Sequence, residues 1–468
     1  MRIGLSIRYK IVWFTIANAR LFYLKARRAH TSQPAGAGVS CAVSMKLTVD
    51  EVDMLRGKQG KAKQKAMEFL LRYGEALGAE QFADTNNVTL CICPEMESLR
   101  RITPALDMDE YISKDSLFSD ETLVIDKLKA FTTSNATYRD YAYPELQKGG
   151  KDACDAAYIG EKYCQRIGIV TLNSCVPYQC GNIPTKGEHC AWTESSAIAY
   201  CNSIIGAKTN IEGSHSAFAS AITGKTPLAG LHLDENRKGT IIVQVDIEMD
   251  DVLNWGLLGY YAGLQAGLEI PVYTNIKNIP DLFMLMSLGA AGMSSGTIAL
   301  FHIPGITPEA ATLDMATGNG KNISVISYGR EERKKTHEIF NRSAKDDVDV
   351  VVLGCPHYSL ERIAAVAGLL EGKKVHESVE LYITVGRMQK AIADRAGYSG
   401  IIKNAGGVLL EDSCGTHLDI DPSKSTASDS AKMLHYLPRM TGVHDTFLGT
   451  LKECVTAAIM GKWTGRAL

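Results

Sequence analysis

The chain has 468 residues, of which 45% are hydrophobic and 22% are charged. This length and composition allow a large buried core and exclude a disordered or fibrous protein. With 50 Lys and Arg against 52 Asp and Glu, the net charge is −2, which argues against nucleic acid as the main partner.

Residues 1–44 form a basic tail whose composition differs from that of the remaining chain. The tail contains seven Lys or Arg and no acidic residue, which leaves 43 basic and 52 acidic residues for the remainder. It resembles a weak secretory signal or a mitochondrial transit peptide, and a misassigned start is the third interpretation. A misassigned start is considered because Thr48 and Glu51, just after Met45, have the spacing of a capping box, which marks the beginning of a helix. We expect a tail that packs little, no membrane-spanning segment, and a cytoplasmic protein, or a mitochondrial one if the tail is a transit peptide.

From Met45 onward, helix-like and strand-like segments alternate along the chain. Strong helix formers and amphipathic spacing predict helices at 61–77, 152–166, 191–205, 359–370 and 388–396. Short apolar runs predict strands at 88–93, 167–172, 240–247, 348–353, 380–385 and 407–410. Because these strands are continuously apolar and separated by helices, they indicate parallel sheets covered on both faces. The sequence therefore predicts an α/β protein with domains at 45–165, 166–335 and 336–468, the last containing a βαβαβ unit.

The twelve cysteines include no C-x-x-C pair, which argues against zinc ribbons and thioredoxin-like motifs and favours reduced thiols. Three of them, Cys175, Cys355 and Cys414, each closely follow a predicted strand. Because the carboxyl ends of parallel strands form ligand-binding crevices, these thiols could converge on an iron–sulfur cluster and leave one iron open to substrate. Three buried free thiols are the alternative. The cysteines inside predicted strands or helices are expected to be structural: Cys91, Cys93, Cys154 and Cys164.

Residues 175–213 are rich in polar and small side chains. Glu188, His189, Glu194, Ser195 and Asn202 lie in or beside the predicted helix at 191–205. A helix N-terminus offers unpaired N–H groups to an anion, and nearby carboxylates and hydroxyls can transfer protons. Each of these residues alone also fits an ordinary surface or packing role. Their density favours a catalytic or substrate-binding site.

A family resemblance begins in the same segment. The motifs CVPY, GN-x-P, GEH-x-AW-x-ESSA, NS-x-x-GA-x-TN, TGKTP and LHLDEN are followed by FHIPGITPEA, GCPH, LYITVGR, EDSCG and SAK-x-x-HY. In this order they resemble the large, catalytic part of aconitase X, a branch of the aconitase superfamily, over residues 46–463. The resemblance implies an aconitase-like fold, with several α/β domains around a central cleft.

The resemblance also implies an activity, a cofactor and a partner. Members of this branch are iron–sulfur hydro-lyases that eliminate water from mevalonate 5-phosphate or cis-3-hydroxy-L-proline, and a small covering domain is fused or carried on a separate small subunit. It implies Cys175, Cys355 and Cys414 as cluster ligands, with the nuclearity left open. The candidates for proton transfer are Ser295, Glu188, Lys432 and Glu194. The candidates for substrate binding are Lys208, Asn202, Asn210, Arg387, Ser195 and His189. Two departures from the family pattern, Asp429 and Lys208, weaken the case for a phosphate group in the substrate.

Other classes of protein stay open at this point. The same thiols would serve an electron-transfer or redox-sensing cluster protein, which would not need the polar helix. A catalytically dead scaffold is a third hypothesis. A nucleotide-binding oxidoreductase is poorly supported, because no G-x-G-x-x-G follows a predicted strand.

Overall fold

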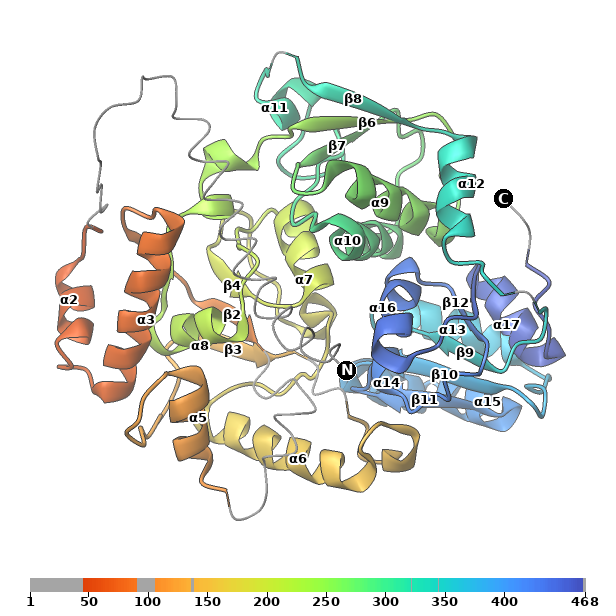
Figure 1. Cartoon of the computed structure of the whole chain (residues 1–468), viewed down its shortest axis with the longest axis horizontal. Helices are drawn as coiled ribbons and strands as arrows, with labels where there is room; N and C mark the ends of the chain where they lie inside the picture. The colour runs from red at the N-terminus through yellow and green to blue at the C-terminus, as the bar shows by residue number, and fades with distance from the viewer. Residues whose placement is uncertain (1–44, 91–105, 136–138, 321, 344, 466–468) are drawn as a thin grey trace, which may run out of the picture.

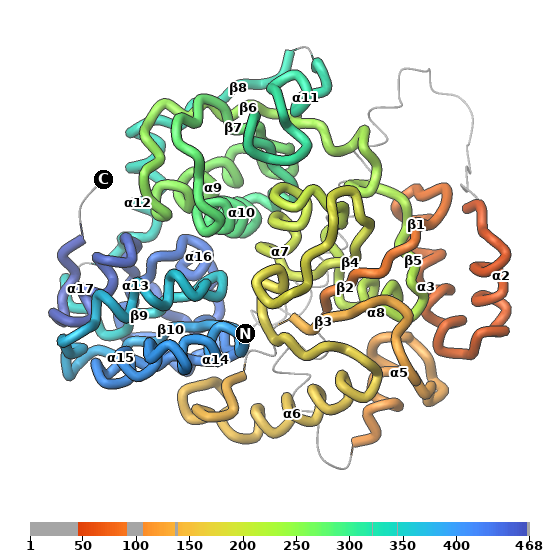
Figure 2. The backbone as a smooth tube through the Cα atoms, turned by 180° about the vertical axis from the view of Figure 1, so that it is seen from behind, coloured from red at the N-terminus to blue at the C-terminus, as the bar shows by residue number. Residues whose placement is uncertain are grey.

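The computed structural model describes residues 45–90, 106–135, 139–320, 322–343 and 345–465 (Figure 1). The predicted tail and the expected roles of Cys91 and Cys93 lie outside these residues. The strands of the described chain form three parallel sheets and one small antiparallel pair. With the helices between them, these sheets confirm the α/β class. In Figures 1 and 2 the largest sheet lies on the opposite side of the molecule from helices α2 and α3. None of the described helices is both long and apolar enough to cross a membrane.

The first sheet has the order β3-β2-β4 and consists of Phe131–Ser134, Asn87–Leu90 and Cys190–Trp192. The helices of this part are α2 (Val49–Leu55), α3 (Lys61–Leu77), α5 (Met108–Ser116), α6 (Gly150–Ile167), α7 (Ser195–Tyr200) and α8 (Ser214–Thr223). The predicted capping box is present at the start of α2, and α3 ends as expected at Gly78, whose φ is 74°. An antiparallel pair, β1 (Phe82–Asp84) and β5 (Lys225–Pro227), lies beside them.

The second sheet has the order β7-β6-β8, formed by Pro271–Thr274, Ile241–Val245 and Ser324–Tyr328. Its helices are α9 (Val252–Ala266), α10 (Leu282–Gly296), α11 (Leu313–Thr317) and α12 (Arg330–Glu338). Glycines let α9 and α10 approach closely, since a Cβ on Gly296 would lie 1.8 Å from the carbonyl oxygen of Gly263. This contact brings the C-terminal ends of the two helices together in the core.

The third sheet has the order β11-β10-β9-β12-β13, and all of its strands are parallel. Its strands are β9 (Val350–Leu353), β10 (Glu380–Val385), β11 (Gly407–Glu411), β12 (Thr426–Ser428) and β13 (Thr446–Leu448). Its helices are α13 (Leu360–Leu370), α14 (Arg387–Arg395), α15 (Tyr398–Ala405), α16 (Ala431–Thr441) and α17 (Leu451–Met460). The predicted βαβαβ unit is therefore confirmed, with two short helices rather than one between β10 and β11.

Two predicted elements are wrong. The strand expected at 167–172 is reduced to one bridge between Val170 and Thr133, because the chain turns at once and Leu172 N–H bonds to Val170 O at 2.9 Å. The helix expected at 191–205 begins only at Ser195. Its first residues join the sheet as β4 instead, and residues 201–205 form a wider helical turn.

Candidate active site

Two of the predicted cysteines lie at the carboxyl edge of the third sheet. Cys355 follows β9 with Gly354 between them, and Cys414 follows β11 after Asp412 and Ser413. Gly354 has a φ of 93°, and a Cβ there would lie 2.2 Å from the carbonyl oxygen of Thr384 on β10, so only glycine fits this turn. The strand order places the two cysteine-bearing loops on either side of β10.

The third cysteine, Cys175, reaches the same place from the first sheet. The chain turns at Asn173, whose φ is 49°, and the backbone N–H of His357 donates to Cys175 Sγ at 3.4 Å. Because His357 is on the loop that carries Cys355, this contact joins the two loops. Burial raises the pKa of all three thiols and is the largest cause of the shift in each of them. The pKa of Cys355 rises to about 12. The structure thus brings the three residues to one region.

A buried ion pair between Lys432 and Glu194 acts on all three thiols. Lys432 is in the first turn of α16, Glu194 directly precedes α7, and their side chains are 10% and 14% exposed. Burial alone would raise the pKa of Glu194, but the attraction and hydrogen bond of Lys432, together with hydrogen bonds from Ser195 and Ser196, lower that pKa. Burial likewise opposes the charge of Lys432, yet Glu194 and the nearby thiols raise its pKa. Both groups are therefore charged at neutral pH.

Two serine hydroxyls complete the surroundings of this pair. Ser195 Oγ and Ser196 Oγ donate to Glu194 Oε1 at 3.1 and 3.3 Å, and Lys432 Nζ donates to Ser196 Oγ at 3.3 Å. Glu194 holds a φ of 73°, which is a strained conformation for a residue with a side chain. Strain of this kind persists where the surroundings impose it, and here it turns the carboxylate toward Lys432. Glu194 and Lys432 therefore interact with the three thiols, and Ser195 joins this group through its bond to Glu194, while the catalytic and binding roles of these residues stay predictions.

The other candidates for proton transfer lie elsewhere. Ser295 is at the end of α10, and its Oγ is 2.9 Å from Tyr260 O and 3.0 Å from Ala291 O. Glu188 is in a surface turn, where its carboxylate accepts from Thr185 N–H at 2.9 Å. Neither has a recorded contact, within the part of the chain that the structure describes, with the three thiols or with Glu194. A catalytic role for either residue stays a prediction without geometric support.

The candidate asparagines hold backbone segments in place. Asn202 Nδ2 donates to Thr209 O and Ala299 O, each at 3.0 Å, while its Oδ1 accepts from Thr209 N–H and from Arg237. Asn210 donates to Ala229 O at 3.1 Å, and its Oδ1 accepts from the N–H of Leu231 at 2.8 Å. These contacts use the amide groups that would orient a substrate.

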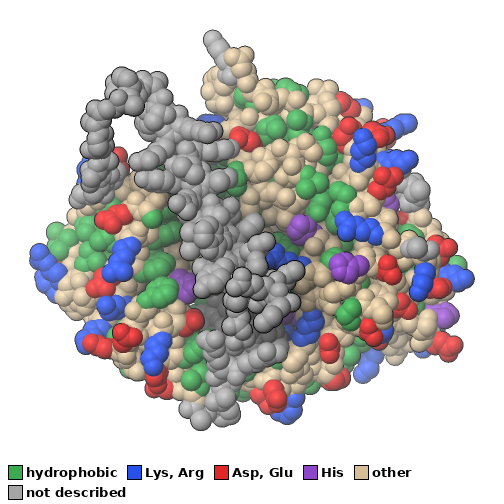
Figure 3. Space-filling view, in the orientation of Figure 1, with side chains coloured by type: hydrophobic (Ala, Val, Ile, Leu, Met, Phe, Trp, Pro, Cys, Tyr) green, Lys and Arg blue, Asp and Glu red, His purple; other side chains and the backbone are tan. Residues whose placement is uncertain are grey.

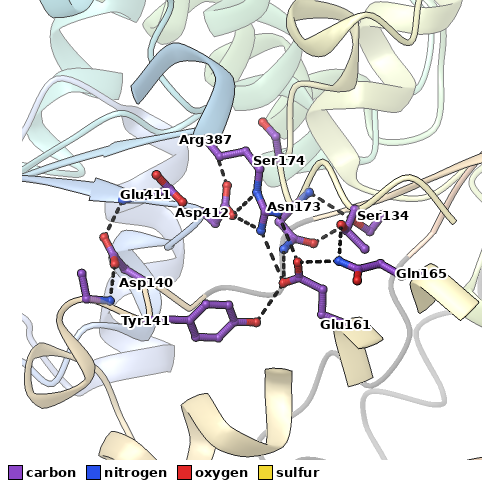
Figure 4. A network of polar contacts seen from close by, with 12 residues as sticks. Ser134, Asp140, Tyr141, Glu161, Gln165, Asn173, Ser174, Arg387, Glu411 and Asp412 are labelled. Carbon is purple, nitrogen blue, oxygen red and sulfur yellow. Dashed lines mark hydrogen bonds and ion pairs between the residues drawn. The ribbon is translucent and has the colours of Figure 1, made fainter. Parts of the chain in front are cut away.

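The basic candidates also have protein partners. Lys208 Nζ is 2.7 Å from Asp234, and His189 Nδ1 is 3.0 Å from His232 Nδ1. Arg387 lies behind the cysteine loops, where its backbone N–H and Nε donate to Asp412 at 2.9 and 2.7 Å and its Nη1 donates to Glu161 at 3.1 Å (Figure 4). Arg387 therefore binds carboxylates of the protein itself.

The unexpected acid Asp429 has a structural explanation. Its carboxylate accepts from Tyr358 Oη at 2.5 Å and from Arg362 Nη2 at 2.7 Å, all within the third domain. This acid neutralises the half-buried Arg362, so it does not count against an anionic substrate at the cysteine loops. Within the described ranges, no three His, Cys, Asp or Glu side chains are grouped closely enough to hold one metal ion.

The fold and site define a class of α/β protein in which two cysteines that follow strands of one sheet, and a third from another part of the chain, lie near a buried Lys–Glu pair. Models of the aconitase X first, second and third domains match residues 44–235, 239–338 and 348–460. The chain belongs to the aconitase X family, which confirms the resemblance found in the sequence.

Individual relatives agree with this assignment. The chain is 35% identical over 403 residues to the phosphomevalonate dehydratase large subunit of Methanocaldococcus jannaschii, covering 84% of this chain and 95% of the relative. It is 29% identical over 459 residues to the cis-3-hydroxy-L-proline dehydratase of Pseudomonas aeruginosa, covering 96% and 76%. The crystal structure of Thermococcus kodakaraensis aconitase X in its holo-form matches with a TM-score of 0.75 at 31% identity, covering 88% of this chain and all of that one.

Proposed function

We propose that the chain is the large subunit of an aconitase X dehydratase that removes water from mevalonate 5-phosphate. Its relatives are dehydratases, and therefore hydro-lyases, and those named as large subunits are 35% identical in two cases. Their name supports a separate small subunit as the partner. The observation that carries the proposal is that Cys175, Cys355 and Cys414 all interact with the buried Lys432–Glu194 pair.

The donor set fits an iron–sulfur cluster. Cys175, Cys355 and Cys414 come from separate loops, and each thiolate of such a cluster binds a different iron, so the sulfurs stand farther apart than the ligands of one ion. Their raised pKa values mean that they are protonated without a metal and must lose protons on binding. When bound, a cluster with three protein ligands supplies a Lewis-acidic iron for the leaving hydroxyl.

Glu194 and Lys432 have distinct proposed roles. The raised pKa of Lys432 opposes loss of its proton, so it does not suit a general base. Glu194 is ionised and can accept the proton from the carbon beside the leaving group. Lys432 then stabilises negative charge that develops on the substrate, in a buried setting where such an interaction is strong. Ser195 and Ser196 keep the carboxylate in position.

A second candidate substrate is cis-3-hydroxy-L-proline, because two relatives at 29% identity bear the name of its dehydratase. Figure 3 shows acidic and basic side chains interspersed over the visible face of the described residues, which is consistent with a small-molecule substrate. The two substrates differ in that only mevalonate 5-phosphate carries a phosphate group. A direct assay therefore decides between them.

The test is anaerobic reconstitution of the full chain with iron and sulfide, alone and with a candidate small subunit. Product formation is followed by mass spectrometry as the loss of one water from either substrate. Cys175→Ser, Cys355→Ser and Cys414→Ser should each lose iron and activity. Cys164→Ser is the matched control, because this buried thiol is in α6 and packs in the core of the first domain. Full iron content in all three variants would contradict the ligand assignment. A stable cluster without dehydration of either substrate would favour the electron-transfer alternative.

A further inference from the structure

One residue, His357, connects all three loops that carry the candidate cluster ligands. It follows Cys355 by two residues and is 2% exposed. Its backbone N–H donates to Cys175 Sγ at 3.4 Å, its Nδ1 is 3.1 Å from Ser174 Oγ, and its Nε2 is 2.6 Å from Ser413 O. Ser174 and Ser413 directly precede Cys175 and Cys414. The ring of His357 therefore links the turns on which those two thiols are placed.

The direction of each hydrogen bond follows from the groups involved. A backbone carbonyl only accepts, so Nε2 of His357 carries the hydrogen that Ser413 O receives. In a neutral imidazole Nδ1 is then the acceptor, and the hydroxyl of Ser174 donates to it. Ser174 Oγ in turn accepts from the N–H of Val176 at 3.2 Å. Both ring nitrogens of His357 and the hydroxyl group of Ser174 thus have defined hydrogen-bond partners.

A second set of contacts holds the same two turns from behind. Asn173 and Asp412 each stand two residues before a cysteine, and both have a positive φ, of 49° and 55°. Asn173 Nδ2 donates to Glu161 at 3.0 Å, and Arg387 binds both Glu161 and Asp412 (Figure 4). The two turns therefore share a left-handed residue two positions before the cysteine, and they are joined through His357 and through Arg387 with Glu161. Contacts that hold both turns together in this way would not be needed if the three thiols had independent roles.

We propose that His357 is a positioning residue that holds the three cysteine loops in the arrangement required for cluster binding before the cluster arrives. This inference rests on the proposed function, because it assumes that the three thiols bind one cluster. His357 acts through Cys175, Ser174 and Ser413 and touches no substrate. Residues that orient metal ligands in this way change metal affinity by about 10- to 100-fold when they are replaced.

The test compares His357→Ala with His357→Gln and His302→Ala. Gln can still donate to Ser413 O through its amide, so it should restore part of the function lost in the alanine variant. His302 is the matched control, because it is also 2% exposed and its Nε2 bonds a backbone carbonyl, Arg237 O, at 2.7 Å. It has no recorded contact with the cysteine loops among the described residues. Any general cost of removing a buried histidine should appear in both alanine variants.

The first readout is the rate at which a chelator removes iron from the reconstituted chain. His357→Ala should lose iron about 10- to 100-fold faster than the wild type, His357→Gln should be intermediate, and His302→Ala should match the wild type. The second readout is hydrogen exchange at residues 173–176 and 413–415 in the cluster-free chain, which His357→Ala alone should accelerate. Wild-type iron retention or unchanged exchange in His357→Ala would overturn the inference. If the wild type binds no cluster, the proposed function fails, while the exchange measurement still decides whether His357 joins the loops.

Discussion

Replacing Lys432 by Met should destabilise the cluster-free chain by leaving Glu194 charged and buried without its counter-charge. Breaking a buried ion pair by removing one partner costs about 3–5 kcal/mol. Here the carboxylate keeps hydrogen bonds from Ser195 and Ser196, which places the expected loss near the lower limit, at about 3 kcal/mol. Glu194→Gln removes the counter-charge of Lys432 and leaves it a neutral amide oxygen and the Ser196 hydroxyl as partners, so its cost should be similar.

The double variant separates the pair from its members. Once both charges are absent, neither group is left unpaired, so the double variant should lose less than the sum of the single variants by about 2–3 kcal/mol. Urea unfolding of the full chain measures each free energy, with circular dichroism and tryptophan fluorescence, to which Trp192 near Glu194 contributes, as probes. Lys335→Met provides the control, because the Lys335–Glu331 pair is 69% and 66% exposed and should contribute at most about 1 kcal/mol.

One outcome would refute the reasoning about this pair. If Lys432→Met and Glu194→Gln each cost no more than Lys335→Met, and if their effects simply add, then the pair is not a buried, coupled unit. Activity measured on the same variants addresses a different question, because Glu194→Gln should abolish dehydration through loss of the proposed base. A Glu194→Gln enzyme that stays folded and retains wild-type turnover would remove Glu194 from the mechanism while leaving the stability argument intact.

Two further predictions concern the core. Burial raises the pKa of Glu212 to about 7, so the folded state favours its protonated form, and the associated stability is lost as pH rises from about 4.5 to about 7. Glu212→Gln should therefore gain stability relative to the wild type over this pH range, by up to about 3 kcal/mol in chemical denaturation, and a constant difference between the two would contradict the assignment. Gly263→Ala should lower the melting temperature, because its Cβ would lie 2.0 Å from Ser295 Oγ and overpacking costs about 1–3 kcal/mol. Gly160→Ala in α6 has open space and should be neutral or stabilising, so equal effects in the two alanine variants would exclude the steric explanation.

The predictions that succeeded rest on local patterns. The strands at 350–353 and 380–385 are mostly buried and mostly apolar, and a glycine follows each of them, so a few neighbouring residues define their extent. The three cysteines could be grouped because parallel strands of one sheet point in the same direction, which gives residues after them a common edge. That argument strictly covers only Cys355 and Cys414. Cys175 follows a single bridge at Val170 rather than a strand of that sheet, so its approach depends on contacts between distant parts of the chain.

The predictions that failed or lack support depend on contacts between distant parts of the chain. Residues 190–192 have helix-compatible neighbours, but their pairing with β2, about a hundred residues earlier, makes them a strand. Arg387 was assigned to a substrate anion because its partner Glu161 could not be recognised inside an ordinary helix pattern. His357 was visible within the GCPH motif, yet only the structure shows that its ring reaches Ser174 and Ser413.

Three of the links around the thiols cross the same domain boundary. Lys432, Arg387 and His357 lie in the region matched by the third aconitase X domain, whereas Glu194, Glu161 and Ser174 lie in that matched by the first. The candidate cluster ligands are divided in the same way, with Cys175 in the first domain and the other two in the third. A group that binds only when both domains are in place stabilises their docking by its binding free energy. The polar contacts between the two domains already hold them together without a cofactor. Less conformational entropy is therefore lost when a cofactor binds, and more of the binding free energy contributes to affinity.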